Sequence, residues 1–150
     1  MKNWLDELKE VLENKTKNFS TQEKENISYK YLNNLMLKIE NRIISENEEL
    51  KSKLEYVINE IPNKTVEKVI VYNTKHLNEI SNLQTFVEEN FKLIKAGTFQ
   101  RRFMVLGIPM GLPFGAAFGN SALSLIIGMI AGLLIGNYLD KKAEKENRTI

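Results

Sequence analysis

Apolar residues recur at helical spacing through the first part of the chain. Residues 2–17 form an amphipathic pattern whose apolar face consists of Trp4, Leu5, Leu8, Val11 and Leu12. Asn18-Phe19-Ser20 interrupts this pattern, and Ser20-Thr21-Gln22-Glu23 fits a capping box, in which the two end residues satisfy free N–H groups of a helix start. We therefore predict a short amphipathic helix within residues 1–18. The balanced charges on its polar face favour packing on other helices over lying on a membrane surface.

Two longer helices are predicted next. One runs from 21 to about 60 and ends at Ile61-Pro62-Asn63, because the residue before a proline disfavours helical geometry. Its apolar residues repeat every seven positions in a row of Tyr29, Met36, Ile43, Leu50 and Val57. Leu32 and Ile39 begin a second row, which drifts to Leu54 and Ile61. The other helix spans about 64–102.

Alternating steps of four and three residues in this last helix predict a coiled-coil seam. The seam consists of Val66, Ile70, Asn73, Leu77, Ile80, Gln84, Val87, Phe91 and Ile94. Its polar members, Asn73 and Gln84, would fix the register. The stretch 69–72 has strand propensity and fits a helix least well. Two long helices most simply pair as an antiparallel hairpin, and a 38-residue helix is about 57 Å long. We therefore expect a rod over 19–100, with Gly97 as a flex point before a membrane helix.

The pattern changes near the C-terminus, where no charged residue lies between Arg102 and Asp140. Seven of the eight glycines fall there, in two rows with four-residue spacing. The first row is Gly107, Gly111, Gly115 and Gly119. The second row begins with a serine and consists of Ser124, Gly128, Gly132 and Gly136. Residues four apart share a helix face, and glycine costs a helix roughly 1 kcal/mol relative to alanine. Bare strips of this kind are typical of close helix contacts in membranes.

The uncharged stretch predicts two transmembrane helices joined by a tight turn. Residues 103–119 and 121–139 would span roughly 25 and 28 Å, close to the ~30 Å of a bilayer core. Gly119-Asn120-Ser121 separates them as a turn-like tripeptide. Pro109 and Pro113 predict a bent or partly irregular first helix. One alternative is that this apolar hairpin is buried inside a soluble oligomer.

The charges predict a topology. Residues 1–100 carry 15 Lys/Arg and 16 Asp/Glu, whereas residues 101–150 carry six and three. Basic residues flank the hairpin on both sides and the turn has none, so the positive-inside rule places both termini in the cytoplasm of a bacterial inner membrane. We see no secretory signal at the N-terminus, and the absence of cysteine excludes disulfides. No basic-aromatic cluster indicates nucleic-acid binding.

Residues 107–115 (Gly-Ile-Pro-Met-Gly-Leu-Pro-Phe-Gly), residues 127–136 (Ile-Gly-Met-Ile-Ala-Gly-Leu-Leu-Ile-Gly) and then Asp140-Lys141-Lys142 make up a familiar pattern. It resembles the C-terminal part of small bacterial glycine-zipper membrane proteins with two transmembrane helices. The resemblance covers residues 103–148. It implies close helix packing and brings no catalytic residues.

The search for chemistry in the sequence yields no catalytic, cofactor-binding or metal site. His76 is the only histidine, and we expect it on the surface or in a groove. The acidic run around Glu48 is expected to be a solvated helix face. Motifs for nucleotide, calcium or zinc binding are absent from the sequence. The sequence therefore argues against an enzyme and predicts no cofactor.

Together these features predict an all-α protein in four parts: a short helix (1–18), a cytosolic helical hairpin or coiled coil (19–100), a transmembrane hairpin (101–142) and a cytosolic tail (143–150). We expect a membrane-anchored protein that self-associates through its rod and glycine faces. The rival hypothesis is an oligomeric pore or membrane-disrupting effector of a toxin or defence system, built on the glycine strips. A third hypothesis is a helical module that docks to an unidentified membrane or cytosolic protein. The expected partners are the lipid bilayer and further copies of the chain, without nucleic acid.

Overall fold

The computed structural model describes residues 3–45, 47–62 and 74–150, and these are helical with short connections, as predicted. They form two compact units, residues 1–92 together with Ile150, and residues 93–149. The helices of the described residues are α1 (Trp4–Thr16), α2 (Thr21–Asn26), α3 (Tyr29–Glu40), α4 (Glu48–Asn59), α5 (Thr74–Phe91), α6 (Thr98–Phe118) and α7 (Ser121–Lys145).

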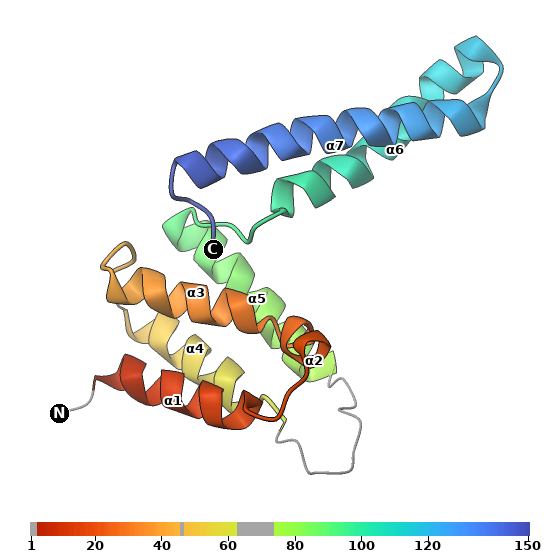
Figure 1. The fold of residues 1–150 in the computed structure, drawn as a ribbon. Helices are drawn as coiled ribbons and strands as arrows, with labels where there is room; N and C mark the ends of the chain where they lie inside the picture. Colours follow the sequence, from red (N-terminus) through yellow and green to blue (C-terminus); the bar gives the residue numbers. More distant parts are fainter. Residues whose placement is uncertain (1–2, 46, 63–73) are drawn as a thin grey trace. The chain divides into compact units, whose positions relative to one another are not determined.

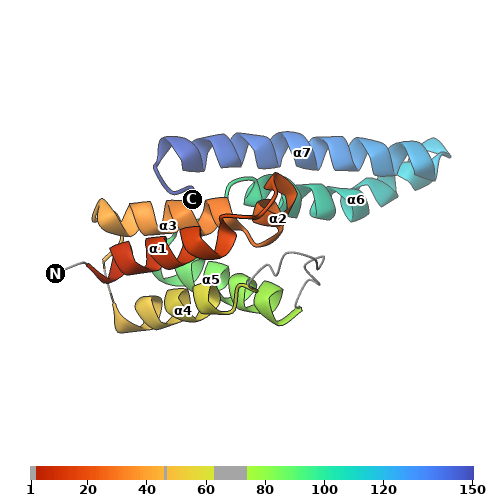
Figure 2. The ribbon, with the colours of Figure 1, turned by 60° about the horizontal axis from the view of Figure 1, so that its bottom comes forward.

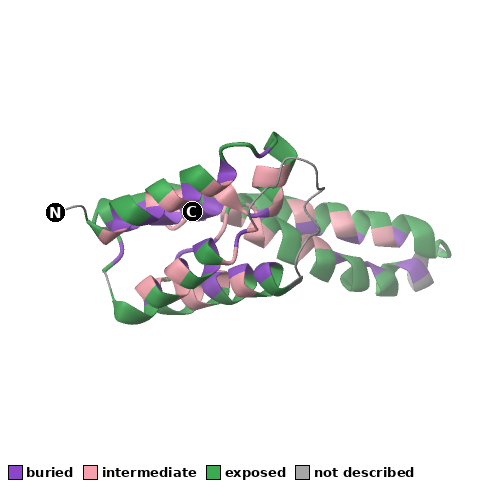
Figure 3. Ribbon diagram, turned by 90° about the horizontal axis from the view of Figure 1, so that it is seen from below, coloured by how far each residue is buried: buried purple, intermediate pink, exposed green. Residues whose placement is uncertain are grey.

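The first unit is a small helical bundle with an apolar core. Helix α1 lies against α3 and α4, and α4 also lies against α5 (Figures 1 and 2). On α1, α3, α4 and α5 the buried residues follow one stripe, and buried residues are purple in Figure 3; α2 has none. Fully buried side chains of the core include Leu12, Leu32, Leu35, Leu54 and Ile58. The predicted packing of the first helix on other helices is confirmed, because Leu5, Leu8 and Leu12 are buried there.

Polar contacts tie α1 to the helices it covers. The Lys9 ammonium donates to the Glu40 carboxylate over 2.8 Å. The Lys15 ammonium donates to the carbonyl oxygens of Asn59 at 2.6 Å and of Ile61 at 3.0 Å. A cation at a helix C-terminus satisfies carbonyl groups that have no partner inside the helix. Lys15 therefore fixes the end of α4 against α1.

The predicted single helix over 21–60 is wrong, because α2, α3 and α4 replace it. Its predicted start is correct, since Ser20 and Glu23 form the capping box. The first break lies at Ser28, with φ 56°, and the second begins at Arg42, with φ 55°. At the second break the Ile43 N–H bonds the Lys38 carbonyl over 2.9 Å, in the hydrogen-bond pattern of a Schellman motif.

The sequence did not predict these helix ends, because Ser28 and Arg42 adopt the left-handed backbone conformation that glycine normally occupies. The left-handed region costs a non-glycine residue roughly 1–2 kcal/mol, so sequence reading places it at glycine or asparagine. The break also explains why Ile43, a member of the predicted heptad row, is exposed, while Ile44 is buried. Packing of the apolar stripes on a bundle core offsets the local strain.

The third predicted helix, 64–102, is also interrupted. Helix α5 ends at Phe91, Lys92 adopts φ 57°, and α6 begins only at Thr98 after Gly97 with φ 75°. Gly97 therefore ends the connection in the left-handed region and is not a flex point within a helix. The predicted seam residues Val66, Ile70 and Asn73, and the stretch 69–72, lie outside the described residues.

The second unit contains α6 and α7, which run antiparallel and side by side (Figures 1 and 2). Helix α6 is continuous through both of its prolines, so they do not interrupt it. The bend that the sequence also predicted there stays a prediction. Gly119 ends α6 with φ 67°, and the Asn120 side chain accepts a hydrogen bond from the Leu123 N–H at the start of α7. Glycine after a helix and asparagine before one are the residues that these positions favour.

Candidate functional site

The two glycine rows face each other across the α6–α7 contact. A methyl group placed on Gly107 would lie 3.2 Å from the Cα of Gly132, and one on Gly111 would lie 3.3 Å from the Cα of Gly128. Both groups would also meet backbone carbonyl oxygens of α7, at Gly128 and Ser124, much closer than van der Waals contact. The rows are therefore buried against each other within one chain, and side chains are excluded from the contact.

Nearly every small residue of the rows takes part in this contact. Gly115 lies against Ser124, whose hydroxyl donates to the Ser121 carbonyl over 2.8 Å. A methyl group on Gly132 would lie 2.8 Å from the carbonyl carbon of Phe103, and one on Gly136 would lie 2.6 Å from the Phe99 carbonyl oxygen. Gly119 is the exception, since it is exposed and serves the turn. The contact therefore extends from the turn to the open end of the pair.

Large apolar side chains point away from this contact. Met110 is 71% exposed and Leu134 is 66% exposed, values that are high for such residues in a folded unit. The exposed apolar residues of the pair are Val105, Leu106, Ile108, Met110, Leu112, Phe114, Leu123, Ile126, Ile127, Ile130, Leu134, Ile135 and Tyr138. The unit is thus apolar outside and glycine-rich inside.

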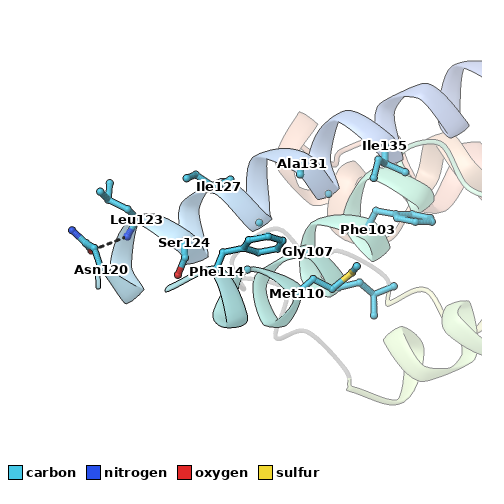
Figure 4. A pocket seen from close by; sticks show the side chains of 14 residues that line it. Phe103, Gly107, Met110, Phe114, Asn120, Leu123, Ser124, Ile127, Ala131 and Ile135 are labelled. Atoms are coloured by element: carbon cyan, nitrogen blue, oxygen red, sulfur yellow. Dashed lines mark hydrogen bonds between the residues drawn. The ribbon is translucent and has the colours of Figure 1, made fainter. Parts of the chain in front are cut away.

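One side of the pair carries an apolar groove of about 760 Å³. Glycines of both helices form part of its lining, and larger side chains stand along its walls (Figure 4). The wall on α6 includes Phe103, Leu106, Met110 and Phe114; the wall on α7 includes Leu123, Ile127, Ala131 and Ile135. Its size falls within the range of ligand sites, about 300–1,000 Å³.

An acidic side chain closes the open end of the pair. The Asp140 carboxylate on α7 accepts hydrogen bonds from the backbone N–H groups of Phe99, at 3.1 Å, and Gln100, at 2.9 Å. These N–H groups lie in the first turn of α6 and have no partner within that helix. The negative charge also complements the positive end of the helix dipole. Sequence reading missed this role, because it depends on a residue that is distant in the chain.

Basic side chains surround this same end. The chain before α6 lies along the chain after α7, since the Ile94 N–H bonds the Arg148 carbonyl over 2.8 Å. Burial lowers the pKa of the Lys95 ammonium, and the neighbouring Arg101 guanidinium lowers it further. Arg101, Arg102, Lys141, Lys142 and Lys145 are exposed. The unit therefore presents an apolar body with positive charge at one end.

The buried face of α5 differs from the predicted coiled-coil seam. On α5, Ile80 and Val87 are buried, Gln84 and Phe91 are half-buried, and Leu77 is 44% exposed. The buried stripe instead follows His76, Ile80, Leu83 and Val87. Ile94 is buried but lies beyond the end of α5.

The expectation that His76 lies at the surface or in a groove is wrong, because it is only 3% exposed. Among the described residues neither of its ring nitrogens has a hydrogen-bond partner. Burial lowers the pKa of this imidazole, and the nearby Lys15 ammonium also disfavours its charged form. The Ile27 backbone and the Glu60 carboxylate act in the opposite direction without outweighing burial. His76 is therefore neutral in the folded bundle near pH 7.

Within the described residues, no group of three or more histidine, aspartate or glutamate side chains is placed to hold a metal ion. Helix α7 is the one described helix that is long and apolar enough to cross a membrane. Comparison with protein-family models, curated proteins and solved structures found no match for this chain. The resemblance to glycine-zipper membrane proteins thus stays a prediction from the sequence.

Proposed function

We propose that the chain is a non-enzymatic membrane-anchored interaction protein in which α6 and α7 form a transmembrane hairpin and the helical bundle stands in the cytoplasm. The observation that carries this proposal is the distribution of side chains in the second unit, which is the reverse of that in the helical bundle. Glycines fill its interior, and the large apolar side chains face outward. Lipid tails are the surroundings in which such a surface has no cost.

The dimensions of the helices support an anchor that spans the bilayer. Helix α7 has 25 residues and α6 has 21, so that they measure about 38 and 32 Å, against a hydrocarbon core of ~30 Å. Only 17% of the most apolar window of α7 is buried, whereas the core helix of a soluble protein would be mostly buried. The burial of α7 therefore favours a lipid-facing helix over a soluble core.

Charge supports the proposed orientation. The turn residues Gly119 and Asn120 are uncharged, and the basic residues gather at the open end of the pair. The positive-inside rule then favours a cytoplasmic location for the open end and both termini. The bundle would face the same compartment and could bind a partner or another copy of the chain there.

The internal packing of the glycine rows weakens the case for the rival, an oligomeric pore. That hypothesis used the glycine strips as contacts between subunits, and these strips are now occupied within one chain. A pore would have to be built from the outward side chains, which include no charged residue between 103 and 139. We therefore favour the anchor, with self-association through surfaces other than the glycine rows.

Single-cysteine labelling tests the topology, because the natural chain contains no cysteine. Ser121→Cys places a thiol beside the turn, and Glu13→Cys places one on the exposed face of α1. We expect a membrane-impermeant maleimide to label the first variant from outside intact cells and the second only after permeabilisation. The full chain should remain in the membrane pellet at alkaline pH.

Release of the chain into the supernatant would contradict the anchor and support the soluble oligomer. Native mass spectrometry in mild detergent measures the number of copies in the assembly and so tests the pore hypothesis. A monomer or small oligomer fits the anchor, whereas a discrete ring of many copies with conductance in planar bilayers would favour the pore. Glycine-to-leucine variants do not separate these hypotheses, because both require the glycine contact inside the hairpin.

A further inference from the structure

We propose that the groove between α6 and α7, together with the basic residues at its open end, binds one anionic phospholipid. This inference rests on the proposed transmembrane hairpin and adds a ligand to it. The acyl chain would lie in the apolar groove, and the phosphate would contact Arg102 and Lys142. Two independent features carry the inference: the shape and composition of the groove, and the order of residues along its walls.

The wall on α7 changes in character toward the open end. Ile127, Ala131 and Ile135 line the groove, and steps of three and four residues continue the same helix face to Tyr138 and Lys142. Tyr138 is 69% exposed and Lys142 is exposed. The row therefore runs from apolar to aromatic to basic, which is the order of acyl chain, interface and headgroup in a bilayer.

The wall on α6 ends in the same way. Met110 and Leu106 line the groove, and one further step of four residues reaches Arg102. Both rows thus place a cation beyond the open end of the groove, one from each helix. Long basic side chains extend toward the interface from such positions, and guanidinium binds phosphate with two parallel hydrogen bonds.

The acidic residues near this end are outnumbered by basic ones. Asp140 is engaged with the N–H groups of Phe99 and Gln100, and Glu146 accepts from the Arg148 guanidinium over 2.7 Å. The second unit carries Lys95, Arg101, Arg102, Lys141, Lys142, Lys145 and Arg148 against Asp140, Glu144 and Glu146. Its charge therefore favours an anionic over a zwitterionic headgroup.

The test measures lipid retained by the full chain after purification in mild detergent, with phosphatidylglycerol or phosphatidylcholine added and bound lipid counted by native mass spectrometry. The variant Arg102→Gln with Lys142→Gln should lower phosphatidylglycerol binding about tenfold or more, since both charges lie at the site. The matched control, Arg101→Gln with Lys141→Gln, removes the same charge from positions off the rows. It should change binding less than about twofold.

A second pair of variants tests the groove. Ala131→Phe fills the groove from its α7 wall, whereas Ala122→Phe adds the same ring at an exposed position outside it. We expect only the first to lower phosphatidylglycerol binding. Equal losses in the two charge variants, or no preference for phosphatidylglycerol over phosphatidylcholine in the natural chain, would overturn the inference. Retention of these variants in the membrane pellet shows that the anchor itself has not failed.

Discussion

The two units of this chain place their apolar residues in opposite ways. In the bundle, leucines such as Leu32 and Leu54 are completely buried and charged residues lie outside. In the α6–α7 pair, the buried positions are glycine, serine and alanine, while Met110 and Leu134 are among the most exposed apolar residues. The same physical rules would give both arrangements if water surrounds the first unit and lipid surrounds the second.

The difference shows which force holds each unit together. Burial of apolar surface away from water drives the formation of the bundle. In the proposed lipid surroundings the pair would have no such gain, so its stability would depend on close backbone packing and on hydrogen bonds at its ends. Substitutions of small residues should therefore damage the second unit most, and truncations of large residues should damage the first.

The largest effect is expected from Gly132→Leu. Even a methyl group there would lie 2.8 Å from the Phe103 carbonyl carbon and 3.2 Å from the Cα of Met104, so the helices must separate. Spin labels on Val105→Cys and Leu134→Cys, both at exposed positions, should report a longer and broader distance distribution by pulsed EPR. Ile130→Leu on the outward face is the matched control and should leave the distribution unchanged. An unchanged distribution in Gly132→Leu would show that the glycine contact is dispensable.

Truncation of a core leucine in the bundle should have the next largest effect. Leu54→Ala removes a completely buried side chain, which should lower the free energy of unfolding of the bundle by about 2–5 kcal/mol. The single tryptophan, Trp4 on α1, reports this transition by fluorescence in urea. Leu37→Ala, at a 39% exposed position of the same unit, should cost much less. Equal losses would contradict the assignment of the core.

Loss of the cap across the pair should have a smaller effect. Asp140→Asn removes the negative charge that accepts the Phe99 and Gln100 N–H groups, and losing such a cap costs about 1 kcal/mol. Amide hydrogen exchange of these two residues should become faster in the variant. The neighbouring exposed Glu144→Gln should not change it. Unaltered exchange in Asp140→Asn would contradict the role of this carboxylate as a cap of α6.

The smallest effect is a pH dependence confined to the bundle. The pKa of His76 lies below its ordinary 6.5 in the folded state, so the unfolded chain takes up the proton first as the pH falls. The contribution of neutral His76 to the free energy of unfolding is fully present above pH 6.5. It decreases as the pH falls from 6.5 to the lowered pKa of the folded state. The urea midpoint from Trp4 fluorescence should therefore fall as the pH is lowered below 6.5. His76→Phe should flatten this part of the profile, and an unchanged slope would assign it to other groups.

Some sequence predictions were correct because they rest on local chemistry. The capping box of Ser20 and Glu23 is present as predicted, and the apolar stripe of the first helix is the face that it buries. The lengths of the next two helices were wrong, since Ser28, Arg42 and Lys92 take left-handed conformations that their residue types do not favour. The sequence also did not predict that α5 buries His76 and exposes Leu77, because a histidine is buried only where neighbouring helices cover it.

The sequence by itself determined that the chain is helical and that its C-terminal part is apolar, because periodicity and composition are properties of the chain alone. Only the tertiary structure decided where the long helical patterns break, that the two glycine rows lie against each other, and that Asp140 caps a helix 40 residues away. These features arise from contacts between distant residues. Such contacts can offset local backbone strain and can place two bare helix faces together, and no local pattern specifies which partner a face will meet.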